Sequence, residues 1–231
     1  MRRKAQKNPA STYFVLGLIV VVAIAVVVVL VMSSTPRTAP TSEFGPDPSI
    51  PRGLTADGLP YLGSENAPVT MRIYEDLGCH NCRDFFRDTE PFILEQFIMT
   101  GKVKLEIYTL AFVNQKSLPG AEAAKCALDQ GKFWEYREVL FVNQDTSLFT
   151  RTDLLGWAEA LNLNRADFAR CYDREVHKQA ILEQSQRAVA IGVNGTPTTE
   201  IRGQRHVGVI AFEGVSGMKQ ILETALAETD G

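Results

Sequence analysis

The hydrophobic pattern divides the chain into a long apolar run, a proline-rich stretch, and a region where strand-like and helix-like periods alternate. Tyr13–Met32 contains twenty residues without one charge. As a helix rising ~1.5 Å per residue, it would cross the roughly 30 Å hydrocarbon core of a bilayer. An isolated segment in lipid satisfies its backbone only as a helix. Residues 1–12 hold four basic and no acidic side chains. The positive-inside rule therefore predicts a cytoplasmic N-terminus, a single-pass anchor in the cell membrane and an extracytoplasmic remainder.

A cleaved signal peptide is the alternative interpretation of this apolar run. The apolar region of such a peptide is usually shorter and ends in a small-x-small site, of which Val31-Met32-Ser33 is a poor version. We therefore expect the anchor to be retained. Residues 33–52 carry five prolines among Ser, Thr and Gly and show no apolar period. This predicts a linker that reaches at most on the order of 60 Å, followed by a folded domain over residues 53–231.

The folded domain opens with a strand–helix–strand pattern. Val69–Glu75 and Val103–Phe112 alternate apolar and polar positions, as strands with one buried face do. Between them, Cys82–Met99 has the apolar spacing of a helix. Pro91 lies inside this helix and predicts a kink or a restart there.

A helical block and a second group of strands complete the domain. The helical pattern extends over about residues 113–192, and Thr150 and Asn164 are expected N-caps within it. The resulting order, βαβ then helices then ββα, predicts an α/β sandwich with an inserted helical domain. The expected helices of the block are Gly120–Gln130, Lys132–Val142, Arg151–Leu161, Arg165–Cys171 and Glu175–Ile191, and the last elements are strands Thr198–Ile201 and Arg205–Ile210 and helix Gly214–Glu228.

Composition and charge limit the classes of protein to which the chain can belong. The chain has 231 residues, of which 45% are hydrophobic and 22% charged, so a collagen or a wholly disordered chain is excluded. Beyond residues 1–12, 20 basic residues stand against 27 acidic ones, a net charge of −7. A net-acidic body argues against nucleic acid as a partner.

Four cysteines carry the candidate chemistry. Cys79-His80-Asn81-Cys82 stands where a strand meets the start of a helix. Unpaired N–H groups and the helix dipole at such a start favour the thiolate of Cys79, the species that attacks disulfides. Cys82 is spaced to resolve a mixed disulfide formed by Cys79, and a protonated His80 would favour the thiolate further. We expect a dithiol redox site.

Two other interpretations of the pair Cys79 and Cys82 stay open. Cys79, His80 and Cys82 could hold copper or zinc, although zinc usually takes four protein ligands and no second close cysteine pair follows. The pair could also form a purely structural disulfide. Haem attachment requires CxxCH, and Arg83 stands at that histidine's position.

Cys126 and Cys171 lie 45 positions apart in the helical block. We expect a structural disulfide between two helices, worth roughly 4 kcal/mol in the chain-entropy model, with free buried thiols as the alternative. Four cysteines allow three pairings, and only Cys79–Cys82 with Cys126–Cys171 leaves the exchange pair intact.

Gly192–Thr198 is a Gly-rich turn that enters a strand at a proline. An X-Pro bond in a tight turn can be cis. A cis Thr196–Pro197 bond would expose the backbone of Thr196 to an extended peptide, whereas a trans bond is the default for such a turn. Elsewhere, Glu75, Asp76 and Glu200 could assist proton transfer from Cys82, but we expect them to be solvated or paired with a base. We expect His177 and His206 to be surface or structural residues.

These features together resemble the thioredoxin superfamily. The strand ending at Asp76-Leu77-Gly78, the CxxC that opens a helix, and Gly195-Thr196-Pro197-Thr198 occur in its order. Residues 126–135 (CALDQGKFWE) are similar to a "C-A-x-x-Q-G-x-F-W-x" stretch of membrane-anchored bacterial members of the DsbA-like branch.

The resemblance implies specific roles. Cys79 would be the nucleophile, Cys82 the resolving cysteine, and Thr196 with a cis Pro197 the substrate platform, without a cofactor beyond the cysteine pair. Such proteins oxidise reduced or unfolded exported proteins. They are re-oxidised by a quinone-linked membrane partner of the DsbB or vitamin K epoxide reductase-like type.

The sequence also departs from the family pattern. His80 stands where many DsbA-like sites have proline, followed by Asn81, and Ile73 occupies the place of the familiar thioredoxin aspartate. The intervening dipeptide influences redox poise, so a reductase or isomerase of the same fold, for example in cytochrome maturation, is the first alternative. A metal-delivery module using Cys79, His80 and Cys82 is the second.

Overall fold

The computed structural model describes residues 46–229. The expected basic segment, the anchor at Tyr13–Met32 and most of the linker lie outside the described residues. Over residues 46–229, no helix is both long and apolar enough to cross a membrane.

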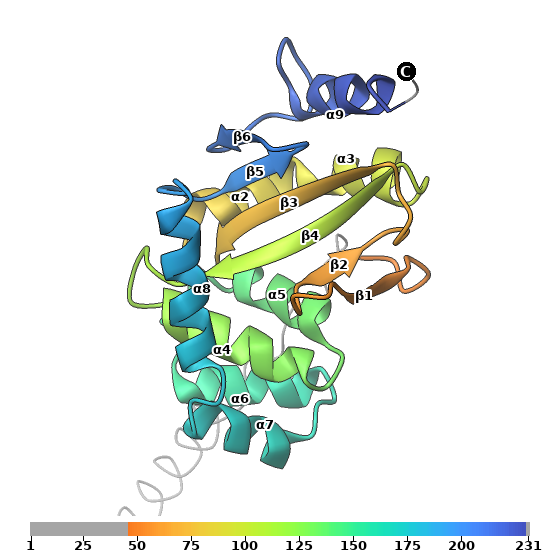
Figure 1. The fold of residues 1–231 in the computed structure, drawn as a ribbon. Coiled ribbons are helices and arrows are strands. Elements are labelled where there is room, and N and C mark those ends of the chain that lie inside the picture. The colour runs from red at the N-terminus through yellow and green to blue at the C-terminus, as the bar shows by residue number, and fades with distance from the viewer. Residues whose placement is uncertain (1–45, 230–231) are drawn as a thin grey trace, which may run out of the picture. The chain divides into compact units, whose positions relative to one another are not determined.

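Six strands form one mixed sheet in the order β1-β2-β4-β3-β5-β6 (Figure 1). The two central strands, β3 and β4, run parallel, and every other neighbouring pair is antiparallel. Their apolar positions are buried on both faces, as in other sheets covered on two sides. The strands are β1 (Arg52–Leu54), β2 (Pro60–Leu62), β3 (Val69–Asp76), β4 (Val103–Leu110), β5 (Thr198–Ile201) and β6 (Gln204–Val207).

A helical segment connects β3 to β4, and a helical block separates β4 from β5. Within the block, α4 and α8 pack against β4, and Figure 1 shows α4, α6 and α7 grouped beyond one side of the sheet. The last helix, α9, packs against β3. The helices are α2 (His80–Asp88), α3 (Glu90–Ile93), the π-helix η1 (Leu94–Ile98), α4 (Ser117–Leu128), α5 (Phe133–Val142), α6 (Arg151–Ala160), α7 (Arg165–Asp173), α8 (Lys178–Ala190) and α9 (Met218–Ala227).

The predicted α/β fold with a helical insertion is confirmed, and so are both N-caps. The Thr150 side chain accepts the backbone N–H of Asp153, and the Asn164 side chain accepts those of Ala166 and Asp167. These bonds satisfy donors that have no partner inside their helices.

The predicted helix Cys82–Met99 starts too late, and the kink or restart predicted at Pro91 is confirmed. The helix begins at His80, which makes Cys79 its N-cap. It breaks at Thr89, whose φ of −121° is not helical, and restarts as α3 with Pro91 in the first turn. Proline is tolerated there because those N–H groups have no helical partner in any case.

The sequence pattern missed β1 and β2 and placed the end of the linker too late. Ile50 is buried in the core, and Arg52 pairs with Leu62 across the sheet. The last residues of the expected 33–52 linker are therefore part of the folded domain. Three-residue strands are too short to show a reliable period-2 pattern.

Candidate active site

The junction between β3 and α2 presents Cys79. As N-cap of α2, Cys79 has φ −81° and ψ 121°. Its N–H donates to the carbonyl of Asp76 at 2.9 Å, and its own carbonyl accepts from the N–H of Arg83 at 3.2 Å. The sulfur of Cys79 is thus placed at the positive end of the helix dipole.

Two side-chain amides from the helical block donate hydrogen bonds to the backbone carbonyls of this junction. The Gln144 amide donates to the carbonyls of Leu77 and Cys79, at 2.8 and 3.1 Å. The Asn114 amide donates to the carbonyl of Gly78 at 2.6 Å. A Cβ at Gly78 would lie 2.5 Å from Asn114 Oδ1, so this approach requires glycine. The roles of Gln144 and Asn114 could not be predicted from the sequence, because the carbonyls that they bind lie 67 and 36 positions away.

Asp76 ties the ends of the two central strands together. One carboxylate oxygen accepts the N–H of Gly78 at 2.8 Å, and the other accepts those of Phe112 and Val113 at 2.9 and 3.0 Å. Burial raises the pKa of Asp76, and these bonds oppose that rise. The expectation that Asp76 is solvated or paired with a base is therefore wrong.

The two thiols have opposite electrostatic environments. A hydrogen bond from Cys82, helped by the backbone N–H groups of Cys82 and Asn81, outweighs burial and lowers the pKa of Cys79 to about 6. Burial raises the pKa of Cys82 well above its usual range, and the charges of Cys79 and Glu75 add to this. At pH 7 a pKa of about 6 leaves ~90% of Cys79 ionised, while Cys82 keeps its proton. In such a pair, the Cys79 sulfur is able to attack or leave as a thiolate, whereas the Cys82 sulfur stays protonated.

Neither intervening residue faces the thiols through a charged group. The His80 imidazole lies 3.2 Å from a carboxylate oxygen of Asp84, and its other nitrogen is 3.4 Å from Arg83. The groups that lower the pKa of Cys79 do not include the His80 side chain. Asn81 is exposed, and only its backbone N–H contributes to the lowered pKa of Cys79.

Thr196 lies directly against Cys79, although 117 positions separate the two residues. The Cys79 thiol donates to the carbonyl of Thr196 at 3.3 Å. The Thr196–Pro197 peptide bond is cis, and the carbonyl of Pro197 accepts the N–H of Gly208 at 2.8 Å. Strand β5 begins at the next residue and pairs with β3, which carries the Cys79 junction at its end.

A buried charge cluster lies beneath the site. Arg137 donates two 2.7 Å bonds to Glu75 and two more to Glu90, and all three residues are at most 2% exposed. Phe86 and Phe141 flank the guanidinium, each with its ring centroid 5.1 Å away. The expectation that Glu75 pairs with a base is confirmed. Arg137 and Glu90 were missed because their partners lie 62 and 47 positions away in sequence.

The second cysteine pair is distant from this chemistry in sequence and in fold. Cys126 of α4 and Cys171 of α7 form a disulfide, with their Cα atoms 5.8 Å apart. Cys79 and Cys82 are both free thiols.

Among residues 46–229, Cys79, His80 and Cys82 do not form a group that could hold a metal ion. The only group of this kind in that range is built around Cys126, Cys171 and His177. The structure therefore gives no support to a metal-delivery site at the CxxC.

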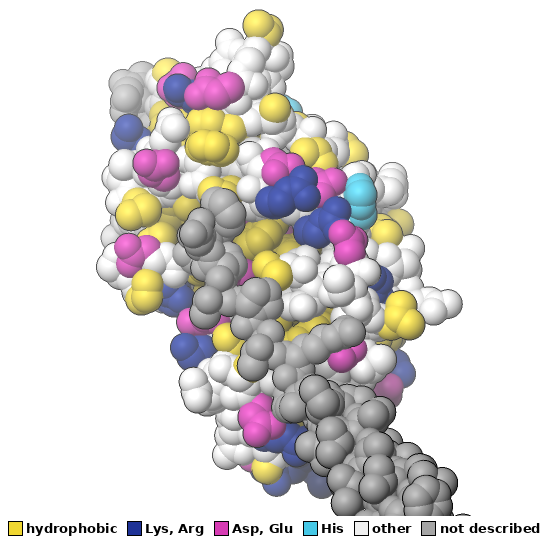
Figure 2. Space-filling view, turned by 180° about the vertical axis from the view of Figure 1, so that it is seen from behind, with side chains coloured by type: hydrophobic (Ala, Val, Ile, Leu, Met, Phe, Trp, Pro, Cys, Tyr) yellow, Lys and Arg dark blue, Asp and Glu magenta, His cyan; other side chains and the backbone are white. Residues whose placement is uncertain are grey.

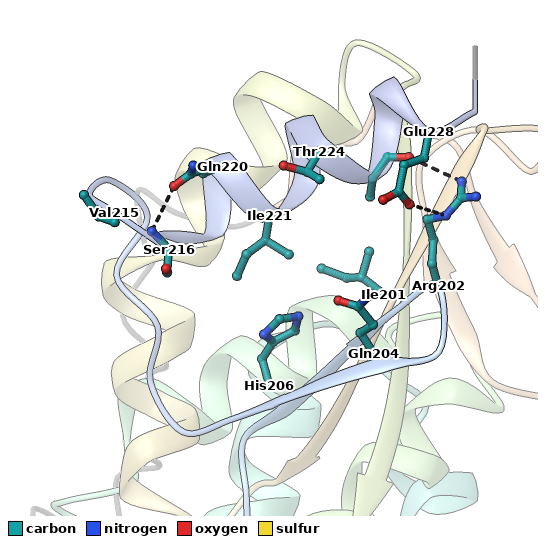
Figure 3. Close-up of a pocket in the computed structure, with 11 residues that line it drawn as sticks. Ile201, Arg202, Gln204, His206, Val215, Ser216, Gln220, Ile221, Thr224 and Glu228 are labelled. Carbon is teal, nitrogen blue, oxygen red and sulfur yellow. Dashed lines mark hydrogen bonds and ion pairs between the residues drawn. The ribbon is translucent and has the colours of Figure 1, made fainter. Parts of the chain in front are cut away.

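The surface also carries pockets away from the cysteine pair. Figure 2 shows hydrophobic patches interrupted by adjacent basic and acidic side chains rather than a field of one charge sign. A cavity of ≈ 410 Å³ lies between β5–β6 and α9, with His206 and Ile221 turned toward it (Figure 3). None of Cys79, Cys82, Thr196 and Pro197 lines it.

A family model described as Thioredoxin matches residues 55–220. The chain belongs to this thioredoxin family. The matched range contains both cysteine pairs and the Thr196–Pro197 turn.

Curated relatives divide into two kinds. A probable disulfide bond formation protein D from Bacillus cereus is 29% identical over 150 residues, which are 62% of this chain and 69% of that protein. Disulfide bond formation protein D of Bacillus subtilis is 29% identical over 61% of this chain and 66% of its own length. The Na⁺/H⁺ antiporter NhaA 3 of Salinispora tropica is 31% identical over 156 residues, 67% of this chain. The chain spans only 23% of that antiporter.

Solved structures show the DsbA-like version of the fold. Wolbachia pipientis α-DsbA1 superposes with a TM-score of 0.67 at 21% identity, covering 77% of this chain and 95% of that one. Oxidised BdbD from Bacillus subtilis gives 0.65 at 23% identity, covering 77% and 96%. This thioredoxin-family chain is thus DsbA-like in architecture, including its inserted helices.

Proposed function

We propose that this protein is an extracytoplasmic thiol–disulfide oxidoreductase that forms disulfides in exported proteins. The observation that carries the proposal is the asymmetry of the pair. Cys79 at the start of α2 has its pKa lowered to about 6, whereas buried Cys82 stays protonated. The relatives named for disulfide bond formation support the same activity.

The reaction starts from a Cys79–Cys82 disulfide. A substrate thiolate attacks the Cys79 sulfur, a mixed disulfide forms, and the Cys82 sulfur leaves with the electron pair of the broken bond and takes up a proton. A second substrate thiolate then attacks the substrate sulfur of the mixed disulfide and displaces Cys79 as thiolate. The substrate loses two electrons and two protons, and the enzyme pair gains the two electrons.

The environment of Cys79 favours this direction. A thiolate stabilised by hydrogen bonds is a good leaving group, and it lowers the free energy of the reduced enzyme relative to the disulfide. A reduced enzyme that is stabilised in this way is a stronger oxidant. We therefore favour the oxidase over the reductase or isomerase.

The cis Thr196–Pro197 turn is the proposed substrate platform. The carbonyl of Thr196 already contacts the Cys79 thiol. A substrate peptide bound along this turn would therefore bring one of its cysteines to the Cys79 sulfur. No cofactor beyond the cysteine pair is needed for the exchange. We further propose that the anchor at Tyr13–Met32 holds the domain outside the membrane, and that a quinone-linked membrane oxidase of the DsbB or vitamin K epoxide reductase-like type removes the electrons.

Trapping of intermediates tests the exchange activity. In Cys82→Ala the mixed disulfide at Cys79 has no resolving thiol, so thiol-sensitive adducts with exported proteins should accumulate in the native membrane. The matched control is Cys79→Ser with Cys82→Ala, which should form none. Adducts that are absent in the first variant, or equal in both, would overturn the proposal.

Redox equilibration with glutathione tests the direction. An oxidase should equilibrate at a potential well above that of glutathione. A potential near or below the glutathione couple would favour the reductive alternative instead.

A further inference from the structure

A second cluster of potential ligands surrounds the Cys126–Cys171 disulfide. Glu122 and Cys126 of α4 and its C-cap Asp129 are spaced four and three positions apart, which places them on one side of the helix. Cys171 comes from α7, and His177 is the N-cap of α8. Three helices of the insertion thus meet at this point.

Three of the potential donor atoms lie within reach of a single ion. One ring nitrogen of His177 and the two cysteine sulfurs all lie within 4.8 Å of one another. His177 Nε2 is 2.7 Å from Asp129 Oδ2, and the same oxygen is 3.6 Å from Cys171 Sγ. Two sulfurs, one imidazole and one carboxylate make up a donor set that suits tetrahedral Zn²⁺.

A buried carboxylate adjoins this cluster through the backbone of His177. Glu122 is only 4% exposed, and one of its carboxylate oxygens accepts the backbone N–H of His177 at 2.8 Å. Its other oxygen, Oε2, has no hydrogen-bond partner in the part of the chain that the structure describes. A buried acceptor without a partner is costly in a protein interior, and a cation bound through His177 would add a favourable charge to the surroundings of this carboxylate.

We propose that opening the Cys126–Cys171 disulfide creates a zinc site with Cys126, Cys171, His177 and Asp129 as ligands. A dithiol reductant supplies two electrons and two protons, becomes a disulfide itself, and leaves two thiols. Binding of Zn²⁺ then displaces the two thiol protons. Tetrahedral Zn–S bonds of about 2.3 Å separate the sulfurs by ~3.8 Å, and this requires rotation of side chains whose Cα atoms are already 5.8 Å apart.

The metal would take over the structural task of the disulfide. It would keep α4, α7 and the start of α8 joined after reduction. It would also withhold two thiolates from exchange with Cys79. The site is separate from the CxxC, so its test does not depend on the proposed oxidase activity.

Zinc binding by the full chain tests the site. In a Cys79→Ser, Cys82→Ser background the only thiols are Cys126 and Cys171, since the chain has four cysteines. This variant is reduced with a phosphine, freed of reductant without air, and titrated with Zn²⁺ against a chromophoric chelator. We expect one tightly bound zinc per reduced chain and none per oxidised chain. Co²⁺ in its place should give the spectrum of tetrahedral thiolate coordination.

Matched histidine variants distinguish a zinc site that includes His177 from zinc bound by the two cysteine thiolates alone. His177→Ala should weaken zinc binding at least tenfold. His206 lines the cavity between β5–β6 and α9, so His206→Ala should leave the zinc affinity unchanged. Three results would overturn the proposal: no zinc on the reduced chain, equal affinity in His177→Ala, or binding that appears only with loss of the helical circular dichroism signal.

Discussion

Replacement of Cys82 by alanine tests whether this residue sets the reactivity of Cys79. The hydrogen bond from Cys82 is the largest influence that lowers the pKa of Cys79 to about 6. A hydrogen bond to a charged group contributes ~1.5–3 kcal/mol, which corresponds to about one to two pKa units. In Cys82→Ala the pKa of Cys79 should therefore rise to roughly 7–8.

The rise can be measured as the pH dependence of alkylation. Because Cys126 and Cys171 are joined, Cys79 is the only thiol that reacts in this variant. At pH 7 its thiolate fraction should fall from ~90% to between ~50% and ~10%, so the alkylation rate should fall about two- to tenfold. Cys82→Ser keeps a donor and is the matched control, with a midpoint closer to that of the native dithiol. A midpoint near 6 in Cys82→Ala would refute the reasoning, because the helix start and backbone donors would then suffice alone.

Three further predictions concern stability. Arg137→Ala leaves two buried carboxylates without their partner and should lower the free energy of unfolding in urea by about 3–5 kcal/mol. Arg151→Ala, which breaks an exposed pair with Asp173, should cost less than ~1 kcal/mol, and equal losses would contradict this account of the buried cluster. Gln144→Leu should cost roughly 1–3 kcal/mol in the same assay, because two carbonyls at the active-site junction lose their donor, and an unchanged midpoint would count against that role. The protein with a reduced active site should gain stability over Cys79→Ser as pH rises from 6 to 9, because the folded pKa of about 6 lies below the ordinary 9.0. The gain should be absent below pH 6, about 1 kcal/mol at pH 7 and on the order of 4 kcal/mol above pH 9, and a flat difference would refute the lowered pKa.

Local features of the sequence were enough to locate the cysteine whose pKa is lowered. A strand followed by CxxC at a helix start predicts a stabilised thiolate, because helix starts leave N–H groups unpaired whatever surrounds them. The caps Thr150 and Asn164 were predictable for the same reason. The two three-residue strands at the start of the domain were not, since a period of two needs more residues to emerge.

Only the tertiary structure decided which groups surround that cysteine. Thr196 reaches Cys79 across 117 positions, Gln144 reaches Leu77 across 67, and Arg137 reaches Glu75 across 62. Periodicity reports which face of an element is buried, but not the partner against which it packs. The choice of partner depends on how the helical insertion folds back onto the sheet. The sequence by itself therefore determined the CxxC pair and the position of Cys79 at a helix start. The packing of the insertion determined the buried charges near the pair and the side-chain donors that hold the loop around Cys79.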